Sequence, residues 1–378
     1  MSRIFIVAGE ASGDLHASNL MKAMREIEPD VEFTCFGGDL MESAGGKILR
    51  HYRDMAYMGF IPVITHLGKI LNNMKECRKA VKESKPDAVV LVDYPSFNLK
   101  IAQFVKEQMS GVPVYYYISP KLWAWKEFRL KSIKKYVDKV FSILPFEVKW
   151  FGERGYKVDY VGNPSVDSVE SREHKGESLS EFCSRNGLPE KPIIALLSGS
   201  RMSEINSSLP KMIEATKDFS DYQILVAGAP SIDKAVYDKI IGENMNVKVL
   251  YNETYQILQN SAAAVVCSGT ATLETALIGT PQTVVYHIGG GKIVHKILRT
   301  FIHVDQVSLV NLIADRIMVR ELIIEDFTVE KVRAEVQRLL TPEVQASMRA
   351  DYSNLREIIG GVGASKRAAE KILSLINK

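Results

Sequence analysis

One feature constrains the fold of this 378-residue chain most: short, continuous apolar runs alternate with stretches of helical periodicity. Runs of Val, Ile, Leu, Tyr and Phe without polar alternation are typical of strands that helices cover on both faces. Such alternation favours a doubly wound parallel sheet. In the first half, the predicted strands are Ile4–Val7, Val31–Phe36, Ala88–Val92, Val112–Ile118 and Lys139–Leu144, and the predicted helices are Leu15–Ile27, Val63–Ser84, Phe97–Met109 and Glu147–Arg154.

The pattern lapses in the polar stretch Gly162–Gly176 and then begins again, which predicts a domain boundary. The second series of predicted strands is Ile193–Leu197, Gln223–Ala227, Val247–Leu250, Ala263–Cys267 and Gln282–Tyr286, and the predicted helices are Ser203–Phe219, Ile232–Gly242, Tyr255–Asn260, Leu273–Ile278 and Lys292–Phe301. The pattern is helical from Thr328 to Leu340 and again from Glu343 to Asn377. We therefore expect an α/β chain with two Rossmann-like, doubly wound parallel-sheet domains that face a cleft, and a helical C-terminal tail. Ligands of such sheets bind at the carboxyl ends of the strands.

Composition excludes several classes of protein. The net charge is +3, which is well below that of a dedicated nucleic-acid binder, so nucleic acid is not an expected partner. No run of about 18 apolar residues is present, and the N-terminal segment does not have the pattern of a signal peptide. The expected location is the cytosol or a membrane face. The four cysteines have no metal-binding spacing; they are Cys35, Cys77, Cys183 and Cys267.

Two turns that follow predicted strands of the first half carry acidic residues. The turn Ala8–Asp14 contains Glu10 and Asp14, which favour recognition of a hydroxyl or an amine over a pyrophosphate. Asp93 follows the buried strand Ala88–Val92, where desolvation would raise its pKa toward the range of a general base. The alternative is that Asp93 caps the next helix, which has Pro95 in its first turn.

The second half has two turns of a different kind, in which glycine and hydroxyl residues open helices. Ser198–Arg201 combines backbone N–H groups with a guanidinium, and Ser268–Ala271 offers amides and hydroxyls; both suit a phosphate. Glu274 lies one helical turn after Thr270, where its carboxylate can accept the hydroxyls of a ribose. These turns predict a nucleotide-diphosphate site made of Ser200, Arg201, Ser268, Gly269, Thr270, Ala271 and Glu274.

Two expected absences also shape the prediction. Gly289–Lys292 lacks the spacing and the hydroxyl of a P-loop, and no Asp-x-Asp occurs to hold a metal ion on a diphosphate. We therefore expect neither a metal nor a cofactor. Arg201 and the helix dipoles would stabilise the leaving diphosphate instead.

Two segments predict an apolar or lipid partner. The first runs from Met55 to Met74 with an apolar stripe that includes Phe60, Ile61 and Ile64; the alternative is a helix packed on the sheet. The second runs from Lys121 to Lys139, where tryptophans stand among cations, as on a protein face that meets an anionic membrane; the alternative is a solvated basic helix. Its candidate residues are Trp123, Trp125, Lys126 and Arg129.

Taken together, these segments closely resemble one family, the lipid-A-disaccharide synthases, which are inverting GT-B glycosyltransferases of family 19. Departures are small, with Val310 where the family often has Pro and Asn163 where it often has His. The matching segments run in order along nearly the whole chain: Ala8–Asp14, Val92–Asn98, Ser119–Trp125, Leu144–Glu147, Val161–Pro164, Gly199–Arg201 with Glu204, Ser268–Glu274 and Val307–Asn311.

The resemblance implies a specific reaction. UDP-2,3-diacylglucosamine would be the donor and 2,3-diacylglucosamine 1-phosphate the acceptor, giving the β-1,6-linked disaccharide 1-phosphate of lipid A and UDP. It also implies a peripheral protein on the inner face of the inner membrane. Residues 1–165 would form the acceptor and membrane-facing domain and residues 166–345 the UDP-sugar domain. The tail, 346–378, would pack on the first domain or on a partner subunit of a homodimer.

The resemblance also suggests roles for single residues. Asp93 is the first candidate for the general base and Glu10 the second, and Asn311 would contact the nucleotide. Two alternatives stay open: another UDP-sugar GT-B enzyme, such as an epimerase or a transferase with a soluble acceptor, and a non-catalytic nucleotide- or lipid-binding protein.

Overall fold

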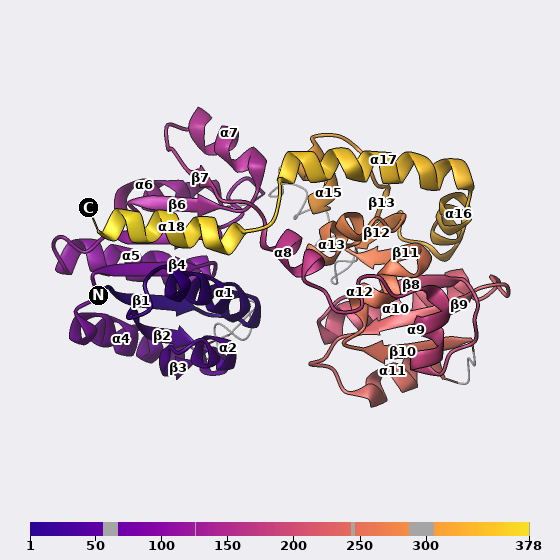
Figure 1. Cartoon of the computed structure of the whole chain (residues 1–378), viewed down its shortest axis with the longest axis horizontal. Coiled ribbons are helices and arrows are strands. Elements are labelled where there is room, and N and C mark those ends of the chain that lie inside the picture. Colours follow the sequence, from indigo (N-terminus) through magenta and orange to yellow (C-terminus); the bar gives the residue numbers. More distant parts are fainter. Residues whose placement is uncertain (56–66, 125, 243–245, 287–305, 378) are drawn as a thin grey trace. The chain divides into compact units, whose positions relative to one another are not determined.

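A computed structural model describes residues 1–55, 67–124, 126–242, 246–286 and 306–377. The chain divides into two compact units, each built on a parallel sheet (Figure 1). The first unit contains Met1–Pro164 and Val362–Lys378, and the second contains Ser165–Gly361. The predicted α/β architecture of two doubly wound sheets is confirmed.

The sheet of the first unit has seven parallel strands in the order β3-β2-β1-β4-β5-β6-β7. The chain therefore winds outward from β1 to one edge, returns to the centre at β4 and winds to the other edge. The strands are β1 (Arg3–Ala8), β2 (Glu32–Gly37), β3 (Lys47–His51), β4 (Ala88–Val92), β5 (Val114–Tyr117), β6 (Lys139–Ser142) and β7 (Asp159–Tyr160).

Helices cover both faces of this sheet. On one face, α1 (Ala11–Ile27) and α18 (Ala364–Ile376) pack with Leu20, Met24 and Ile372 in one apolar cluster. On the other face, a second cluster joins the sheet to the helices α4 (Leu67–Ser84), α5 (Pro95–Gln108), α6 (Leu130–Tyr136) and α7 (Pro145–Glu153). Short elements complete the unit: α2 (Asp39–Ser43), η1 (Tyr52–Asp54) and η2 (Glu127–Arg129).

The second unit repeats this plan with six parallel strands in the order β10-β9-β8-β11-β12-β13. The strands are β8 (Ile193–Leu197), β9 (Gln223–Gly228), β10 (Val247–Tyr251), β11 (Ser261–Cys267), β12 (Gln282–Tyr286) and β13 (Glu321–Ile323). The helices are α8 (Pro164–Glu170), α9 (Leu179–Asn186), α10 (Met202–Thr216), α11 (Lys234–Ile241), α12 (Thr254–Gln259), α13 (Thr270–Ile278), α15 (Leu309–Ala314), α16 (Val329–Leu339) and α17 (Pro342–Ile359).

The predicted helix Thr328–Leu340 is confirmed as α16, but the predicted helix Glu343–Asn377 is divided into α17 and α18. Gly360 and Gly363 have φ angles of 80° and 100°, a region that glycine adopts readily, and they end α17 and begin α18. Helix α17 belongs to the second unit and α18 to the first, so residues 346–378 are divided between the units. Figure 1 shows α18, in yellow, beside the indigo and violet elements of the first unit.

The predicted helix Lys292–Phe301 and the start of the predicted helix Val63–Ser84 lie outside the described residues. Within the described ranges, no helix is long and apolar enough to cross a membrane.

Candidate active site

In the first unit, the turn after β4 holds Asp93 in an unusual backbone conformation. Asp93 and Tyr94 have φ angles of 44° and 47°, which cost energy for residues other than glycine and persist only where neighbours fix them. Two hydrogen bonds fix this backbone conformation. Asn98 Nδ2 donates to the Asp93 carbonyl at 2.7 Å, and the Tyr116 hydroxyl donates to the same oxygen. Tyr94 is the N-cap of α5 and no side chain caps this helix, so the alternative that Asp93 is a helix cap is wrong.

The environment of Asp93 suits a proton acceptor. Burial raises the pKa of its carboxyl, while the Lys121 ammonium and the Tyr94 backbone N–H act in the opposite direction. A buried carboxylate whose pKa is raised holds a proton more strongly than a solvated one does. Asp93 can therefore remove a proton from a hydroxyl group that is brought to this edge of the sheet.

Glu10 lies in the turn after β1, at the N-cap position of α1. A Cβ atom on Gly9 would lie 2.2 Å from Cδ1 of Tyr94, so only glycine fits between this turn and the Asp93–Tyr94 turn. The close approach brings the Glu10 turn alongside the Asp93 turn. Asp14, by contrast, accepts backbone N–H groups from Gly38 at 2.8 Å and from two residues of α2, which gives it a structural role.

A buried carboxyl group that the sequence analysis did not single out lies at the same edge. Glu147, in the first turn of α7, is 1% exposed, and burial raises its pKa to about 7. Its oxygens accept hydrogen bonds from Trp123 Nε1 at 3.0 Å, from Ser119 Oγ at 2.9 Å and from Ser142 Oγ. An acid in a first helical turn usually needs no function, so the sequence signal was weak.

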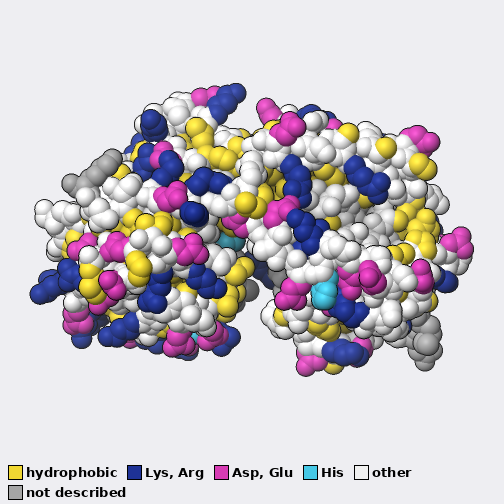
Figure 2. Space-filling model, in the orientation of Figure 1, with side chains coloured by type: hydrophobic (Ala, Val, Ile, Leu, Met, Phe, Trp, Pro, Cys, Tyr) yellow, Lys and Arg dark blue, Asp and Glu magenta, His cyan; other side chains and the backbone are white. Residues whose placement is uncertain are grey.

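The structure describes only some of the residues predicted to contact the acceptor or the membrane. Arg129 is half-buried and donates to Ser96 Oγ at 2.7 Å. Burial lowers the pKa of Lys126, and the Arg129 guanidinium lowers it further. Trp123 is half-buried, with its ring edge-on to Phe146. On the face drawn in Figure 2, cations and acids intermingle over both units. Four predicted residues lie outside the described part of the chain: Phe60, Ile61, Ile64 and Trp125.

In the second unit, the two glycine turns lie at the same edge of the sheet because β8 and β11 are neighbours, with Leu197 paired to Val266. Ser198–Arg201 leads into α10, and Gly199 has a φ of 101°. The Glu204 carboxylate closes this turn by accepting from the Ser200 and Arg201 backbone N–H groups at 3.0 and 3.3 Å and from the Arg201 guanidinium at 3.1 Å. The Arg201 side chain is 61% exposed, so it can reach an anion.

The turn Ser268–Ala271 opens α13, with Gly269 as its N-cap. The first amides of a helix have no partner within it, so Thr270 and Ala271 can present N–H groups to an anion. Ser268 has a second task, because its hydroxyl donates to the Val307 carbonyl at 3.0 Å. The hydroxyl thus holds the segment before α15 next to the turn.

Glu274 lies one turn into α13 and is partly buried. Burial raises the pKa of its carboxyl, and a hydrogen bond from Tyr255 of α12 acts against this shift. Tyr255 was not a candidate in the sequence analysis, because nothing in the sequence links positions 255 and 274.

Asn311 is 1% exposed, and its amide makes four hydrogen bonds within the unit. Its Oδ1 accepts from the backbone of Met318 and Val319 at 2.8 and 3.0 Å, and its Nδ2 donates to the Val319 carbonyl and to Glu321. Glu321 also accepts from the backbone N–H groups of Val307 and Ser308. Asn311 therefore fixes the segment that Ser268 touches.

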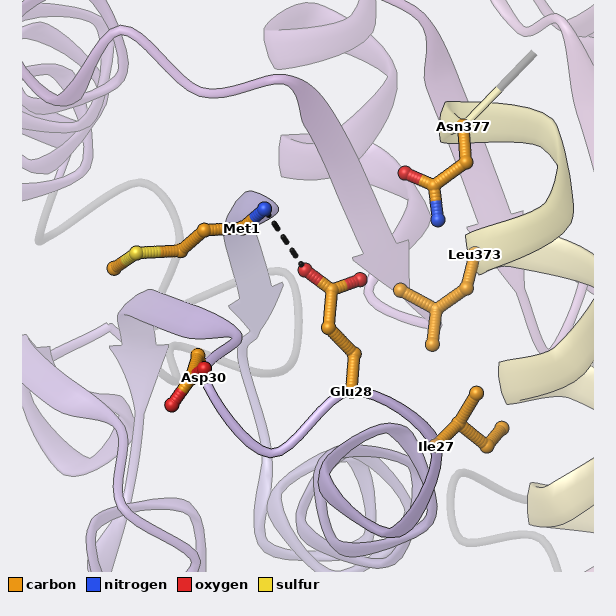
Figure 3. Close-up of a pocket in the computed structure, with 6 residues that line it drawn as sticks. All are labelled: Met1, Ile27, Glu28, Asp30, Leu373 and Asn377. Atoms are coloured by element: carbon orange, nitrogen blue, oxygen red, sulfur yellow. Dashed lines mark ion pairs between the residues drawn. The ribbon is translucent and has the colours of Figure 1, made fainter.

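A pocket of about 330 Å³ lies elsewhere in the first unit (Figure 3). It is lined by Ile27 and Glu28 at the end of α1, and Glu28 pairs with the Met1 ammonium at 3.5 Å. Helix α1 spans about 25 Å for its 17 residues, so this pocket is far from the Glu10 turn at the start of the helix. Among the described residues, no group of three or more His, Cys, Asp or Glu side chains is arranged to hold a metal ion.

Comparison with known proteins decides the family. The sequence profile described as lipid-A-disaccharide synthetase matches residues 4–375. A lipid-A-disaccharide synthase from Syntrophus aciditrophicus is 38% identical over 99% of this chain and 98% of its own length. One from Myxococcus xanthus is 39% identical over 99% and 97%.

The chain belongs to the lipid-A-disaccharide synthase family. Solved structures add the fold. An S. aureus MnaA structure with UDP matches 100% of this chain and 97% of its own at a TM-score of 0.70 and 13% identity. A UDP-GlcNAc 2-epimerase from Neisseria meningitidis bound to UDP-GlcNAc matches 98% and 100% at a TM-score of 0.66 and 13% identity. At this identity the likeness shows the shared GT-B type of fold alone.

Proposed function

We propose that this chain is an inverting glycosyltransferase that joins UDP-2,3-diacylglucosamine to 2,3-diacylglucosamine 1-phosphate. The products are the β-1,6-linked disaccharide 1-phosphate of lipid A and UDP. One observation carries the proposal: the family match extends from residue 4 to residue 375, so it includes both sheets and both sets of turns. The alternative of a UDP-sugar epimerase is not favoured, because the similarity to solved epimerases is one of fold.

The first unit supplies the proton acceptor in this proposal. The acceptor 6-hydroxyl attacks the anomeric carbon of the donor from the face opposite UDP, so the configuration at that carbon inverts. The proton of the hydroxyl passes to the Asp93 carboxylate as the new C–O bond forms and the bond to UDP breaks. Glu10, in the adjoining turn, is the second candidate for this role.

The second unit holds the donor nucleotide in this proposal. The diphosphate binds the Arg201 guanidinium, the Ser200 hydroxyl and the amides and hydroxyl at the start of α13, which stabilise negative charge as UDP leaves. The Ser200 and Arg201 amides are held by Glu204 and shape the turn. Glu274 accepts the ribose hydroxyls. The expected contact of Asn311 with the nucleotide does not fit a side chain that is 1% exposed and whose amide makes four hydrogen bonds within the unit, so Asn311 contributes by fixing the segment before α15. The diphosphate residues are Ser200, Arg201, Ser268, Gly269, Thr270 and Ala271.

We further propose that Lys126 and Arg129 bind the acceptor 1-phosphate. Arg129 is half-buried, and its guanidinium donates a hydrogen bond to the Ser96 hydroxyl, which carries no charge. Next to it, Phe128 is 68% exposed, so an apolar ring stands among cations. This arrangement supports peripheral attachment of the first unit to an anionic membrane surface, on the inner face of the inner membrane. Vesicle co-sedimentation of F128S tests the attachment; unchanged binding would reject a role for Phe128.

The proposed function has a direct test. The purified protein is incubated with both acylated glucosamine substrates, and mass spectrometry follows the disaccharide 1-phosphate and UDP. We expect equal amounts of the two products, and no disaccharide when either substrate is omitted. UDP release without disaccharide, or conversion of the donor to an epimer, would contradict the proposal. Light scattering on the same sample tests whether the chain forms a homodimer.

A further inference from the structure

Glu147 is a buried carboxyl group that the proposed mechanism does not use. Its two oxygens accept three side-chain hydrogen bonds, from the end of one strand and from the segment after another strand of the first unit. Ser142 ends β6, whereas Ser119 and Trp123 lie on the segment that follows β5. A carboxylate only accepts hydrogen bonds, so all three donors point at it. Glu147 therefore ties the Ser119–Trp123 segment to the start of α7.

The tied segment begins beside the general-base candidate. Strands β4 and β5 are neighbours with Val92 paired to Tyr117, and the Asp93 N–H donates to the Tyr117 carbonyl at 3.3 Å. Two residues later the segment reaches Ser119, the first contact of Glu147. Lys121 lies between the two residues that Glu147 holds.

We propose that Glu147 is a positioning residue, whose carboxylate fixes the Ser119–Trp123 segment and thereby holds the Lys121 ammonium beside the Asp93 carboxylate. This inference rests on the proposed role of Asp93 as the base of the glycosyl transfer. It assigns Lys121 the task of keeping that base ionised, in a site where burial favours the protonated form.

The charges around Asp93 support this assignment. Lys121 stands in the segment between Ser119 and Trp123, which Glu147 holds beside the Asp93 turn. Its ammonium acts to lower the pKa of both Asp93 and Glu147. The Tyr94 N–H also acts on Asp93, and Tyr116 has a pKa that burial and Asp93 raise well above the usual value. The acidic residue of the adjoining turn is Glu10. Arg129 acts on Tyr116. Among these groups, Lys121 is the cation that acts on Asp93 directly.

The first experiment removes the ammonium. Lys121→Met keeps the length of the side chain and loses the charge, so the pKa of Asp93 should rise by about one unit. The acidic limb of the pH profile of kcat/KM for disaccharide formation should move to higher pH by the same amount. The matched control is Lys100→Met, an exposed position on α5 that should leave the limb in place. An unmoved limb in Lys121→Met would overturn the role of Lys121.

The second experiment tests whether Glu147 acts through Lys121. Glu147→Gln can still accept from Trp123, while its amide donates to the two serine hydroxyls, so we expect the limb to stay within about 0.3 units of the parent. Glu147→Ala removes the acceptor of these hydrogen bonds and frees the Ser119–Trp123 segment. It should therefore shift the acidic limb of the pH profile to higher pH, as Lys121→Met does. In a Lys121→Met background, Glu147→Ala should add no further movement. Additive movement would show that Glu147 acts independently and would overturn the inference.

Two further measurements separate a failure of this inference from a failure of the proposed function. Where Glu147→Ala does not fold, Trp123→Phe removes one of the three hydrogen bonds and should move the limb in the same direction by a smaller amount. The Asp93 carboxyl can also be titrated by ¹³C NMR, with Asp93→Asn for its assignment, in the parent and in Lys121→Met. A protein that makes no disaccharide yet shows the shift refutes the proposed function alone, whereas an unshifted Asp93 resonance refutes the inference.

Discussion

The two units share an architecture but differ in what their sheet edges present. At the first edge, Asp93 and Glu147 are carboxyl groups whose pKa burial raises. At the second edge, helix starts present N–H groups and hydroxyls beside an exposed guanidinium, and Glu204 and Glu321 are satisfied by backbone N–H groups. The proposed function requires this difference, because the first unit accepts a proton and the second binds the diphosphate of the donor.

The difference follows from what comes directly after each strand. After β4, an acid stands at the end of a strand that is buried on both faces, so water solvates its charge less than it would at the surface. After β8 and β11, glycines let the chain turn tightly. After β11 the first amides of α13 stay available to an anion, whereas after β8 the Ser200 and Arg201 amides donate to Glu204 and leave the Arg201 guanidinium exposed. Under the proposed function, two or three residues after the strand decide whether the same strand–helix unit accepts a proton or binds an anion.

The largest expected effect tests the first edge alone. Asp93→Ala should lower turnover by about 10²–10⁴-fold, the usual loss when a general base is removed. UDP affinity, measured by calorimetry, should stay within about twofold of the parent. Glu10→Gln is the companion variant, because it separates the two base candidates. Near-normal turnover of Asp93→Ala together with a large loss in Glu10→Gln would move the base to Glu10.

The second prediction concerns the other buried carboxyl of the first edge. The pKa of Glu147 is about 7 in the folded chain and near 4.5 in the unfolded one. Between these values the folded state keeps a proton that the unfolded state releases, so stability falls as pH rises from about 5 to about 7. Glu147→Gln does not titrate, so its free energy of unfolding relative to the parent should rise by up to about 3 kcal/mol over this range.

Tryptophan fluorescence during urea unfolding at pH 5 and pH 8 measures this effect in the first unit, which contains all three tryptophans, Trp123, Trp125 and Trp150. Glu153→Gln, an exposed position on the same helix, is the matched control. Identical pH dependences for the parent and Glu147→Gln would refute the prediction.

The third prediction addresses the second edge. Arg201→Ala should weaken UDP binding by about tenfold, the lower end of what a charged hydrogen bond contributes. The acidic limb of the pH profile should not move, because Arg201 belongs to the anion-binding edge. Arg349→Ala, an exposed position on α17, is the control. Unchanged UDP affinity would contradict the assignment of Arg201 to the diphosphate. A shifted acidic limb would contradict the separation of proton transfer and anion binding between the two sheet edges.

The smallest expected effect tests how the second edge is held together. Ser268→Ala removes the hydrogen bond to the Val307 carbonyl and should lower the free energy of unfolding by about 1 kcal/mol. Calorimetric melting can detect the corresponding decrease of about 2 °C, with Ser353→Ala as a surface control. A loss of UDP affinity larger than the loss of stability would show that the hydroxyl also contacts the nucleotide.

Sequence patterns predicted the central strands well and the edge strands poorly. Strands β1, β4, β5, β8 and β9 are buried along nearly their whole length, so their sequences are continuous apolar runs. The missed strands are β3, β7 and β13, which lie toward the sheet edges and are short and partly exposed. Their residues have less need to be apolar, and the pattern that reveals a strand is lost.

The candidate site shows the same limit. Asp93 and the glycine turns could be found because each directly follows a strand whose apolar run is plain. Glu147, Tyr255 and Glu321 could not, because their importance comes from contacts with residues distant in the chain, such as Tyr255 with Glu274. Sequence analysis also proposed a binding residue that has a structural role. Asp14 is an acid in a turn after a strand, but its carboxylate oxygens accept hydrogen bonds from backbone N–H groups of the α2 region.

Helix α18 carries a consequence for synthesis of the chain. Its Ala368, Ala369, Ile372 and Leu373 complete the apolar cluster of α1, yet they are made some 340 residues after it. On the ribosome, every segment of the second unit emerges before this cluster can close. The nascent first unit must therefore carry an open apolar face until α18 has been made, and a ribosome that stalls before α18 would leave that face exposed to chaperones and proteases.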